Sequence, residues 1–341
     1  MRRELVCDKP ATPPRLLIRT CETPRALADQ VCVRVHATAV NPIDVKRASG
    51  YGRRLLGLKG AASFPLVLGN DFAGQVEAIG AGVSRFAPGQ HVFGVVATGK
   101  QGGSHASHLI VPQEQLRMAH DAADLAMLAT LPYSFTTMWL AVRSTGLTRA
   151  NADGKRVLIN GASGGLGRLC LQLLRGWGSE VTAICGRSGV DDCLALGAVR
   201  AVERGGKGIA SLPADFHVAL NFGAWNDEPA LASRLGRDAL GHATTVHPLL
   251  ANFDRFGWWR GALASRREWR AMRSAVTERA PSARYDWTLF RPDREALDVL
   301  EAGTRERKFS LPIGIRVSFE EASAAFAHVA AAKPGRALFA P

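Results

Sequence analysis

Three glycines at a fixed spacing offer the clearest chemistry in this sequence. Gly161, Gly164 and Gly167 follow a short apolar run at 155–160 and precede a stretch of helical pattern at 166–177. In such a turn the first glycine permits a tight reversal, the second lets the backbone approach a pyrophosphate, and the third lets helix and strand pack closely. Exposed N–H groups and the positive end of the helix would hold the anion, together with Ser163, Gly165 and Leu166. The spacing G-x-x-G-x-x-G differs from the usual G-x-G-x-x-G, so the position between a strand and a helix carries the prediction of a dinucleotide site.

The end of the next predicted strand indicates which dinucleotide fits. An acid there would bind the ribose 2′-OH of NAD, but the strand at 180–185 is followed by Gly186, Arg187 and Ser188. A guanidinium and a hydroxyl suit a 2′-phosphate instead. Arg204, after the following short strand, is a further candidate, with an ordinary surface arginine as the alternative. We therefore predict NADPH in preference to NADH.

These motifs need secondary-structure elements that position them. The strand, turn, helix and strand from 155 to 185 form a βαβ pattern, which implies a parallel sheet, and further strands are predicted at 217–222 and 243–247. Residues 31–37 alternate with period two in a part rich in Gly and Pro, which predicts a β-rich region. A helical pattern covers 125–142 with a break at Pro132. A chain of 341 residues should form two domains.

Composition limits the class of protein. Hydrophobic residues make up 47% of the chain and charged residues 21%, which excludes wholesale disorder. The apolar runs fall far short of the ~20 residues that cross a bilayer, and the opening residues lack the apolar core of a signal peptide. Six scattered cysteines without C-x-x-C spacing indicate a reducing compartment, so we expect a cytoplasmic protein.

The charge balance is unusual. The net charge is +13, and the basic residues are 35 Arg and 8 Lys. Such a surplus favours an anionic partner, which could be nucleic acid, a membrane surface or a phosphorylated small molecule. An arginine-biased composition explains the surplus equally well, so charge alone does not select a function.

Several segments together resemble a known family. Residues 39–44 (AVNPID), 69–71 (GND), 131–133 (LPY) with Thr137 and Trp139, and the glycine turn are similar to the zinc-independent quinone oxidoreductase branch of the medium-chain dehydrogenase/reductases. Further segments point to a mitochondrial subgroup of that branch, namely 41–51 (NPIDVKRASGY), 249–257 (LLANFDRFG), Tyr285-x-Trp287 and 319–326. The resemblance covers nearly the whole chain.

The resemblance implies a fold and an activity. It implies an α/β protein with a GroES-like, β-rich catalytic domain from both chain ends, at 1–124 and 292–341, and a Rossmann domain with a doubly wound parallel sheet at 125–291. It further implies a homodimer that uses NADPH to reduce a quinone or another activated alkene or carbonyl in the cleft between the domains. The alternative is an NADPH-binding protein with weak turnover that acts in regulation or through a nucleic-acid or partner surface.

The resemblance also implies that no metal is bound. Zinc-dependent relatives carry Cys at the position of Asn41 and a His-Glu pair at Asn70 and Asp71, and an amide does not replace a thiolate ligand. His105 and His108 are loosely spaced and have no cysteine or acidic partner in a zinc-binding pattern. A mechanism that needs a Lewis acid is therefore disfavoured.

Individual residues acquire expected roles from the same resemblance. Asn41 could offer its amide to a substrate or ribose oxygen, with an Asn-Pro turn as the alternative, and Asp44 should hold that turn. Tyr51 could donate a proton or a hydrogen bond, or be structural. Contacts with the cofactor are implied for Thr137, Phe222, Gly223 and Arg336.

A basic and aromatic segment occupies about 250–290. Five aromatic side chains lie between 253 and 269, and ten arginines lie between 255 and 294. The segment could cover the substrate cleft as a lid, form solvated surface, lie on an anionic membrane or bind nucleic acid. The sequence leaves these alternatives open.

Overall fold

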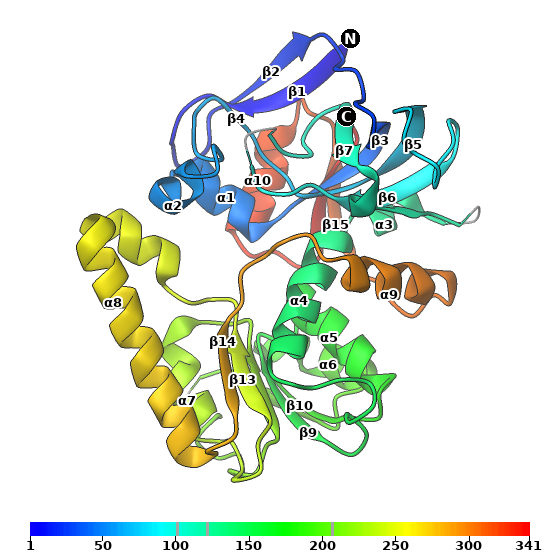
Figure 1. Cartoon of the computed structure of the whole chain (residues 1–341). Helices are drawn as coiled ribbons and strands as arrows, with labels where there is room; N and C mark the ends of the chain where they lie inside the picture. Colours follow the sequence, from blue (N-terminus) through cyan, green and yellow to red (C-terminus); the bar gives the residue numbers. More distant parts are fainter. Residues whose placement is uncertain (100–101, 121–122, 206–207) are drawn as a thin grey trace. The chain divides into compact units, whose positions relative to one another are not determined.

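The computed structural model describes residues 1–99, 102–120, 123–205 and 208–341, whose elements are labelled in Figure 1. Contacts divide the chain into two units. The first unit comprises residues 1–133, 253–255 and 291–341, and the second comprises 134–252 and 256–290. The predicted domain limits, 1–124 with 292–341 and 125–291, stay predictions beside these contact-based limits.

The first unit is β-rich and contains strands from both the N-terminal and the C-terminal part of the chain. Its main sheet has the strand order β15-β16-β3-β5-β6-β8, with β7 paired to β3, and a smaller sheet has the order β2-β1-β4. The strands are β1 (Arg2–Cys7), β2 (Leu16–Cys21), β3 (Gln30–Val40), β4 (Leu66–Val67), β5 (Asp71–Ile79), β6 (His91–Val95), β7 (His108–Pro112), β8 (Leu116–Met118), β15 (Ile313–Val317) and β16 (Arg336–Phe339). The helices are α1 (Pro42–Ala48), α2 (Arg53–Gly57), α3 (Leu125–Leu128), α9 (Arg294–Arg305) and α10 (Ala322–Ala330), with a 3₁₀ turn η1 (Gln113–Gln115).

Side-chain alternation explains the core of this unit. Val31, Val33 and Val35 on β3 point into one cluster with Phe72 and Val92, as the period-two pattern predicts. β16 pairs antiparallel with β3 through Ala337 opposite Val40. This register brings the end of β3 and the start of β16 together although about 300 residues separate them.

The second unit is a parallel α/β sheet. Six strands run in the order β11-β10-β9-β12-β13-β14 within the described residues, which is the doubly wound order 3-2-1-4-5-6. The strands are β9 (Arg156–Asn160), β10 (Glu180–Cys185), β11 (Arg200–Glu203), β12 (Val218–Asn221), β13 (Gly241–Thr244) and β14 (Arg284–Trp287). The helices are α4 (Pro132–Ser144, whose first two residues belong to the first unit), α5 (Gly165–Arg175), α6 (Val190–Ala195), α7 (Glu228–Ala232) and α8 (Leu249–Arg279), with 3₁₀ turns η2 (Arg187–Gly189) and η3 (Trp225–Asp227). The predicted α/β fold, with a β-rich unit formed from both ends of the chain and a Rossmann-type doubly wound sheet, is confirmed.

Most predicted elements of this unit are confirmed, and one strand is displaced. Pro132 begins α4, because proline fits the first turn of a helix where its missing N–H is not needed. The strand predicted at 243–247 lies at Gly241–Thr244 instead. A Cβ at Gly241 would lie within 3 Å of backbone atoms of Thr145 and Arg284. The missing side chain lets the sheet begin there, and a hydrophobic pattern does not detect such a close approach.

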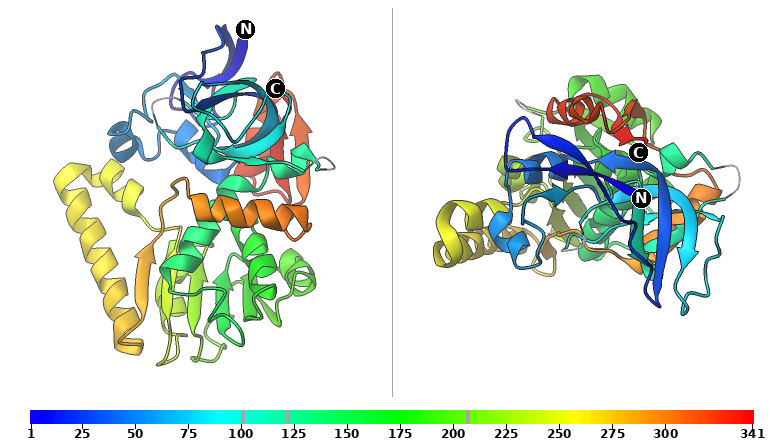
Figure 2. Two further views of the ribbon diagram at one scale, coloured as in Figure 1. Left: turned by 45° about the vertical axis from the view of Figure 1, so that its right-hand side comes forward. Right: turned by 90° about the horizontal axis from the view of Figure 1, so that it is seen from above.

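Helix α8 is long and kinked. Gly257 has φ 78° and ψ −170°, so it interrupts the helical backbone. Beyond the kink the helix runs beside the β13–β14 side of the sheet (Figures 1 and 2), where Met272 and Val276 pack with Leu231 and Leu235. Among the described residues, no helix is both long and apolar enough to cross a membrane.

Candidate functional site

The glycine turn lies between β9 and α5, at the carboxyl edge of the parallel sheet. Gly161 has φ 79°, and a Cβ there would lie 2.8 Å from the carbonyl carbon of Phe222. A Cβ on Gly167 would lie 2.4 Å from the Cα of Ala162. At Gly164, which is exposed, the nearest atom to a Cβ would be the Gly161 oxygen at 3.3 Å. Gly161 and Gly167 are therefore required by packing inside the protein, whereas Gly164 leaves space for a ligand.

The turn also has the electrostatics of an anion site. Gly164 is the N-cap of α5, an eleven-residue helix that begins at Gly165 and continues with Leu166. The first N–H groups of a helix have no acceptor within it, and the helix dipole adds positive potential there. The exposed glycine backbone and this helix end fit the pyrophosphate of a dinucleotide.

Arg187 and Ser188 lie beside the turn. Both are exposed in η2, directly after β10, and β10 is the neighbour of β9. A Cβ on Gly189 would lie 2.5 Å from the Cβ of Ser163, so the glycine turn and η2 are in close contact. No ion pair with Arg187 is found within the described part of the chain. The guanidinium is accessible to an anionic group at this edge.

Arg204 reaches the same edge from β11 but has a partner. Its Nη2 lies 3.1 Å from Oδ2 of Asp227, and the same carboxylate oxygen accepts a hydrogen bond of 2.9 Å from Nδ2 of Asn160. The arginine side chain is 42% exposed. An ion pair this accessible contributes only about 0–1 kcal/mol, so a phosphate could compete with Asp227. Binding of a 2′-phosphate by Arg204 stays a prediction.

Two asparagines join the carboxyl ends of β9 and β12. Asn160 Nδ2 donates to Oδ1 of Asn221 over 3.0 Å, and that oxygen also accepts from the backbone N–H of Gly223 at 3.1 Å. Phe222 and Gly223, both predicted to contact a cofactor, are half-buried in the following loop. A Cβ on Gly223 would lie 2.6 Å from Nδ2 of Asn160, so glycine is needed there for this contact.

A buried carboxylate supports this loop from α7. Glu228 accepts hydrogen bonds from Asn221 Nδ2 at 2.6 Å, from His242 Nε2 at 2.8 Å and from the Tyr285 hydroxyl at 3.1 Å. The Trp287 indole N–H donates to the Tyr285 hydroxyl at 2.8 Å. Burial by itself raises the pKa of Glu228, but His242 and the hydrogen bonds outweigh it, so that pKa lies below its usual value. The group stays ionised and fixes β12, β13 and β14 relative to one another.

Glu228 and His242 were not predicted from the sequence. The one signal in the sequence is Asn221, at the end of the strand predicted at 217–222, where the family resemblance leads us to expect an acid. The structure supplies that acid from α7, seven residues later. Thr137, predicted to contact the cofactor, is buried on α4 in the same unit.

In the first unit, Asn41 lies in a buried ionic cluster with Asp71 and Arg336. Its Nδ2 donates to Oδ2 of Asp71 over 2.8 Å, and its Oδ1 accepts from Nη2 of Arg336. The Arg336 guanidinium lies 3.7 Å from the same Asp71 oxygen. Asn41 and Asp71 have no exposed surface. Both ends of the Asn41 amide thus have partners inside the protein, and Arg336, predicted to contact a cofactor, occupies the third corner of this cluster.

Burial shifts the pKa of Asp71 in this ionic cluster, and hydrogen bonds from the backbone hold its carboxylate and that of Asp44 in place. Burial raises the pKa of Asp71 to about 6, although Arg336 and Asn41 both act to lower it. The other oxygen of Asp71 accepts from the backbone N–H of Tyr133. As predicted, Asp44 holds the turn after Pro42, because its carboxylate accepts from the backbone N–H groups of Asn41 at 2.8 Å and Gly69 at 2.9 Å.

Tyr51 lies elsewhere in the first unit, after Gly50 with φ 89°. The Lys46 ammonium lies 5.6 Å from the centre of its ring. Burial and the nearby Asp254 raise the pKa of the phenol. Asp254 itself accepts from the backbone N–H groups of Gly52 and Arg54, which gives the segment 249–257 a structural role that its sequence did not reveal. A proton-donating role for Tyr51 stays a prediction.

The histidine pair does not converge. The buried His105 ring donates from Nε2 to the carbonyl of Ala39 at 3.0 Å, whereas His108 Nε2 lies 2.9 Å from Glu77. Over the described ranges, no group of three or more His, Cys, Asp or Glu side chains could hold a metal ion.

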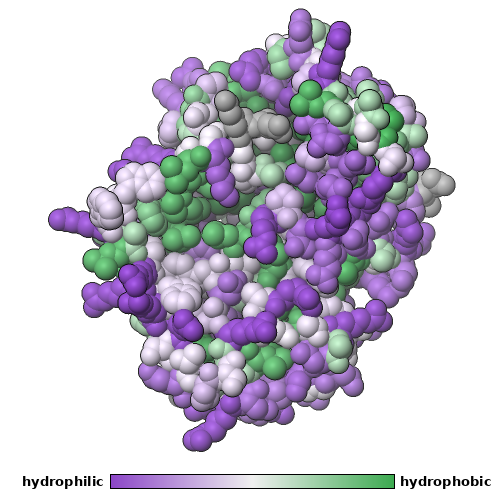
Figure 3. Space-filling view, in the orientation of Figure 1, coloured by the Kyte–Doolittle hydropathy of each residue, from purple (hydrophilic) through white to green (hydrophobic). Residues whose placement is uncertain are grey.

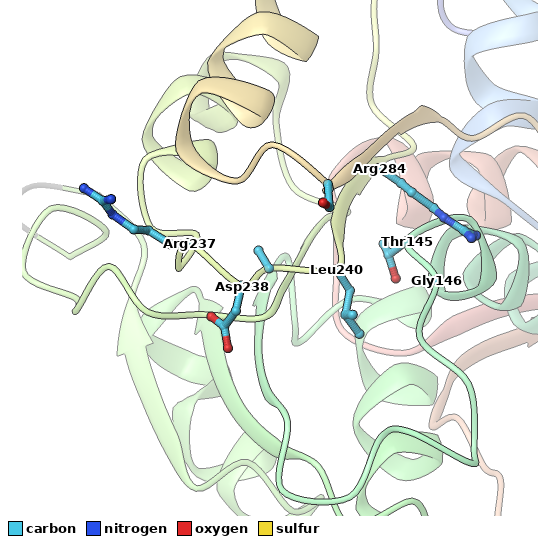
Figure 4. Close-up of a pocket in the computed structure, with 8 residues that line it drawn as sticks. Thr145, Gly146, Arg237, Asp238, Leu240 and Arg284 are labelled. Atoms are coloured by element: carbon cyan, nitrogen blue, oxygen red, sulfur yellow. The ribbon is translucent and has the colours of Figure 1, made fainter.

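A pocket of about 340 Å³ lies at the opposite edge of the parallel sheet. It is lined by residues that precede or begin β13 and β14, including Asp238, Leu240 and Arg284. Figure 4 shows the side chains of Arg237 and Arg284 extending in opposite directions. These two charges therefore do not converge on one point of the pocket, and the glycine turn at the carboxyl edge is the stronger candidate site.

Comparison with known proteins shows the family to which this chain belongs. The model of the alcohol dehydrogenase GroES-like domain matches residues 27–121. The Drosophila melanogaster NAD(P)H oxidoreductase RTN4IP1, mitochondrial, is 31% identical over 317 residues, which cover 88% of this chain and 76% of that protein. The chain belongs to the medium-chain dehydrogenase/reductase family.

Vertebrate members are similar to the same extent. The human NAD(P)H oxidoreductase RTN4IP1 is 35% identical over 243 residues, 67% of this chain and 61% of that protein, and the Danio rerio protein is 30% identical over 295 residues, 79% and 72% of the two chains. The match thus spans less than two thirds of the mammalian relatives. The predicted relationship with the mitochondrial reticulon-interacting oxidoreductases is confirmed.

Solved structures of other medium-chain dehydrogenase/reductases share the fold. The quinone oxidoreductase of Coxiella burnetii has a TM-score of 0.80 at 19% identity and covers 100% of this chain and 99% of its own. The CurK enoyl reductase also has a TM-score of 0.80, at 20% identity with 99% of both chains covered.

Proposed function

We propose that this chain is an NADPH-dependent oxidoreductase that reduces a quinone or another activated alkene or carbonyl by hydride transfer without a catalytic metal. The observation that carries the proposal is the exposed glycine turn at the start of α5, in contact with η2 and its accessible Arg187. The names of the relatives support a nicotinamide cofactor, and one relative, from Arabidopsis thaliana, is named a chloroplast envelope quinone oxidoreductase homolog.

The residues of the second unit divide the binding of NADPH between them. The backbone from Ser163 to Gly167 would hold the pyrophosphate, and Arg187 with Ser188 would hold the 2′-phosphate as a charge-assisted pair. Glu228 and Asn221 keep the loop at Phe222 and Gly223 fixed, so little ordering is left for the bound state. When bound, NADPH supplies the hydride, and the protein orients it and excludes water.

The donor set of the buried ionic cluster supports chemistry without a metal. At two positions where zinc-dependent relatives carry ligands, this chain has the amide of Asn41 and the carboxylate of Asp71, and the guanidinium of Arg336 lies against both. A guanidinium at hydrogen-bond distance from Asn41 opposes a divalent cation, and an amide is a poor zinc ligand. Substrate polarisation would then come from hydrogen bonds alone.

Stopped-flow oxidation of NADPH by the purified chain tests the proposal. The acceptors would be a panel of quinones and enones, with NADH in place of NADPH as the matched comparison. We expect turnover of at least one acceptor, a higher kcat/KM with NADPH than with NADH, and no loss of rate after treatment with a chelator. A higher kcat/KM with NADH would overturn the cofactor assignment.

The same experiment distinguishes the proposed oxidoreductase from the alternative function. NADPH binding with no oxidation across the whole panel would favour a weakly catalytic, regulatory or partner-binding protein. The homodimer and the cytoplasmic location stay predictions, to be checked by light scattering and by imaging of a tagged chain.

A further inference from the structure

The part of α8 beyond the kink has two chemically different faces. Gly261, Ser265, Met272 and Val276 are buried on the inner face. Glu268 also has a partner on the protein, because its carboxylate accepts a hydrogen bond of 2.8 Å from Nδ2 of Asn252. Glu268, the one acid between residues 258 and 277, therefore lies on the inner side of the helix.

The outer face combines large apolar side chains with arginine. Trp259 is 90% exposed and Leu263, one helical turn later, is 68% exposed. Four exposed arginines surround this pair on the same side of the helix: Arg260, Arg266, Arg267 and Arg270. Since Glu268 points inward, the stretch 259–270 presents four positive charges and no carboxylate on its outer face. Along the left-hand edge of Figure 3, over α8, hydrophilic side chains stand among pale and apolar ones.

The combination of exposed apolar side chains and arginines on this face favours a lipid surface over nucleic acid. Transfer of an exposed indole and a leucine side chain out of water lowers the free energy. Indole in particular favours the boundary between lipid headgroups and acyl chains. Guanidinium groups around them would bind lipid phosphates. Nucleic acid would satisfy the arginines but would leave Leu263 without an apolar partner, because most protein contacts to a duplex are made to its phosphates and sugars.

We propose that the outer face of α8, residues 259–270, docks this protein on the surface of an anionic phospholipid bilayer. The helix would lie in the plane of the interface with Trp259 and Leu263 inserted and the four arginines at headgroup level. The proposal does not depend on the oxidoreductase function, and it adds a location at the membrane surface that neither the fold nor the family match gives.

Vesicle flotation with the full chain tests the proposal. The vesicles would be phosphatidylcholine alone and phosphatidylcholine with about one third phosphatidylglycerol, at low and high salt. The variants are W259A/L263A, R266E/R270E and the control R149E/R200E, which makes the same charge change at two exposed arginines of the second unit outside α8. All the altered residues are exposed, so thermal melting should show the same fold in each variant.

We expect the anionic vesicles to bind the chain at least about tenfold more strongly than the neutral ones, with binding weakened by salt. W259A/L263A and R266E/R270E should each lose about tenfold, and R149E/R200E should bind like the unaltered chain. Equal loss in R149E/R200E, or unchanged binding of W259A/L263A, would overturn the proposal. So would duplex DNA that binds the chain as tightly as the anionic vesicles do, since the face would then be a general polyanion site.

Discussion

Asn41 donates its side-chain N–H to the Asp71 carboxylate over 2.8 Å, and neither residue has exposed surface. The amide oxygen of Asn41 is used as well, by Arg336. The contact therefore fixes the start of α1 to the start of β5 and to β16, three elements from distant parts of the sequence. Asn41 acts in this unit as a positioning residue, and its direct contact with substrate stays a prediction.

The raised pKa of Asp71 predicts a specific pH dependence of stability. Its pKa of about 6 lies above the unfolded value near 3.8, so the folded chain binds this proton more tightly than the unfolded chain does. Between these two values the free energy of unfolding should fall as pH rises, by up to about 1.4 kcal/mol per pH unit from this group. In D71N this contribution should be missing from urea unfolding measured between pH 4 and 7.

An exposed carboxylate provides the control for that experiment. Asp191 is exposed at the start of α6, so D191N should keep the slope of the unaltered chain. Equal slopes in D71N and the unaltered chain would show that Asp71 is not the group responsible.

Alanine substitution at two glycines of the turn, Gly164 and Gly167, should affect different properties of the protein. At Gly164 a Cβ meets only one oxygen at 3.3 Å, so G164A should fold normally but bind NADPH at least about tenfold more weakly, because the Cβ occupies the space for the pyrophosphate. At Gly167 a Cβ would lie 2.4 Å from the backbone, so G167A should lower the melting temperature markedly. Calorimetric titration and thermal melting measure the two effects. Normal NADPH affinity in G164A would place the pyrophosphate elsewhere.

Arg187 predicts the preference between the two nicotinamide cofactors. R187A should raise KM for NADPH by about tenfold or more, the loss of one charge-assisted contact, and leave KM for NADH nearly unchanged. Steady-state kinetics with both cofactors measure this ratio. R200A is the matched control, because Arg200 is exposed at the amino end of β11, away from the glycine turn. A parallel rise for both cofactors would contradict binding of the 2′-phosphate.

Glu228 predicts a large loss of stability when it is removed. E228A would leave the buried donors of His242 and Asn221 and the half-buried hydroxyl of Tyr285 without their acceptor, at a cost of about 3–5 kcal/mol in the free energy of unfolding. E228Q keeps one acceptor and should lose less. Denaturant unfolding compares them with E180A, which alters an exposed glutamate on β10. A change below about 1 kcal/mol in E228A would show that these hydrogen bonds contribute little.

The sequence by itself determined the elements whose signals are local. The alternation at 31–37, the apolar run at 155–160, the break at Pro132 and the glycine spacing each reflect the conformation of a few neighbouring residues. They are confirmed in β3, in β9, at the start of α4 and in the turn before α5. The position of the glycine turn at the carboxyl edge of the sheet could be predicted for the same reason, since strand, turn and helix follow one another directly, and binding of a cofactor there stays a prediction.

Only the tertiary structure decided which distant side chains meet. Arg336 reaches Asn41 because β16 pairs with β3, and Glu228 reaches His242 and Tyr285 because β12, β13 and β14 are neighbours in a sheet. The inward position of Glu268, which leaves the outer face of residues 259–270 without a carboxylate, likewise depends on its hydrogen bond from Asn252, which lies before the kink of α8. Burial and long-range pairing set these contacts, and neither has a local signature in the order of residues.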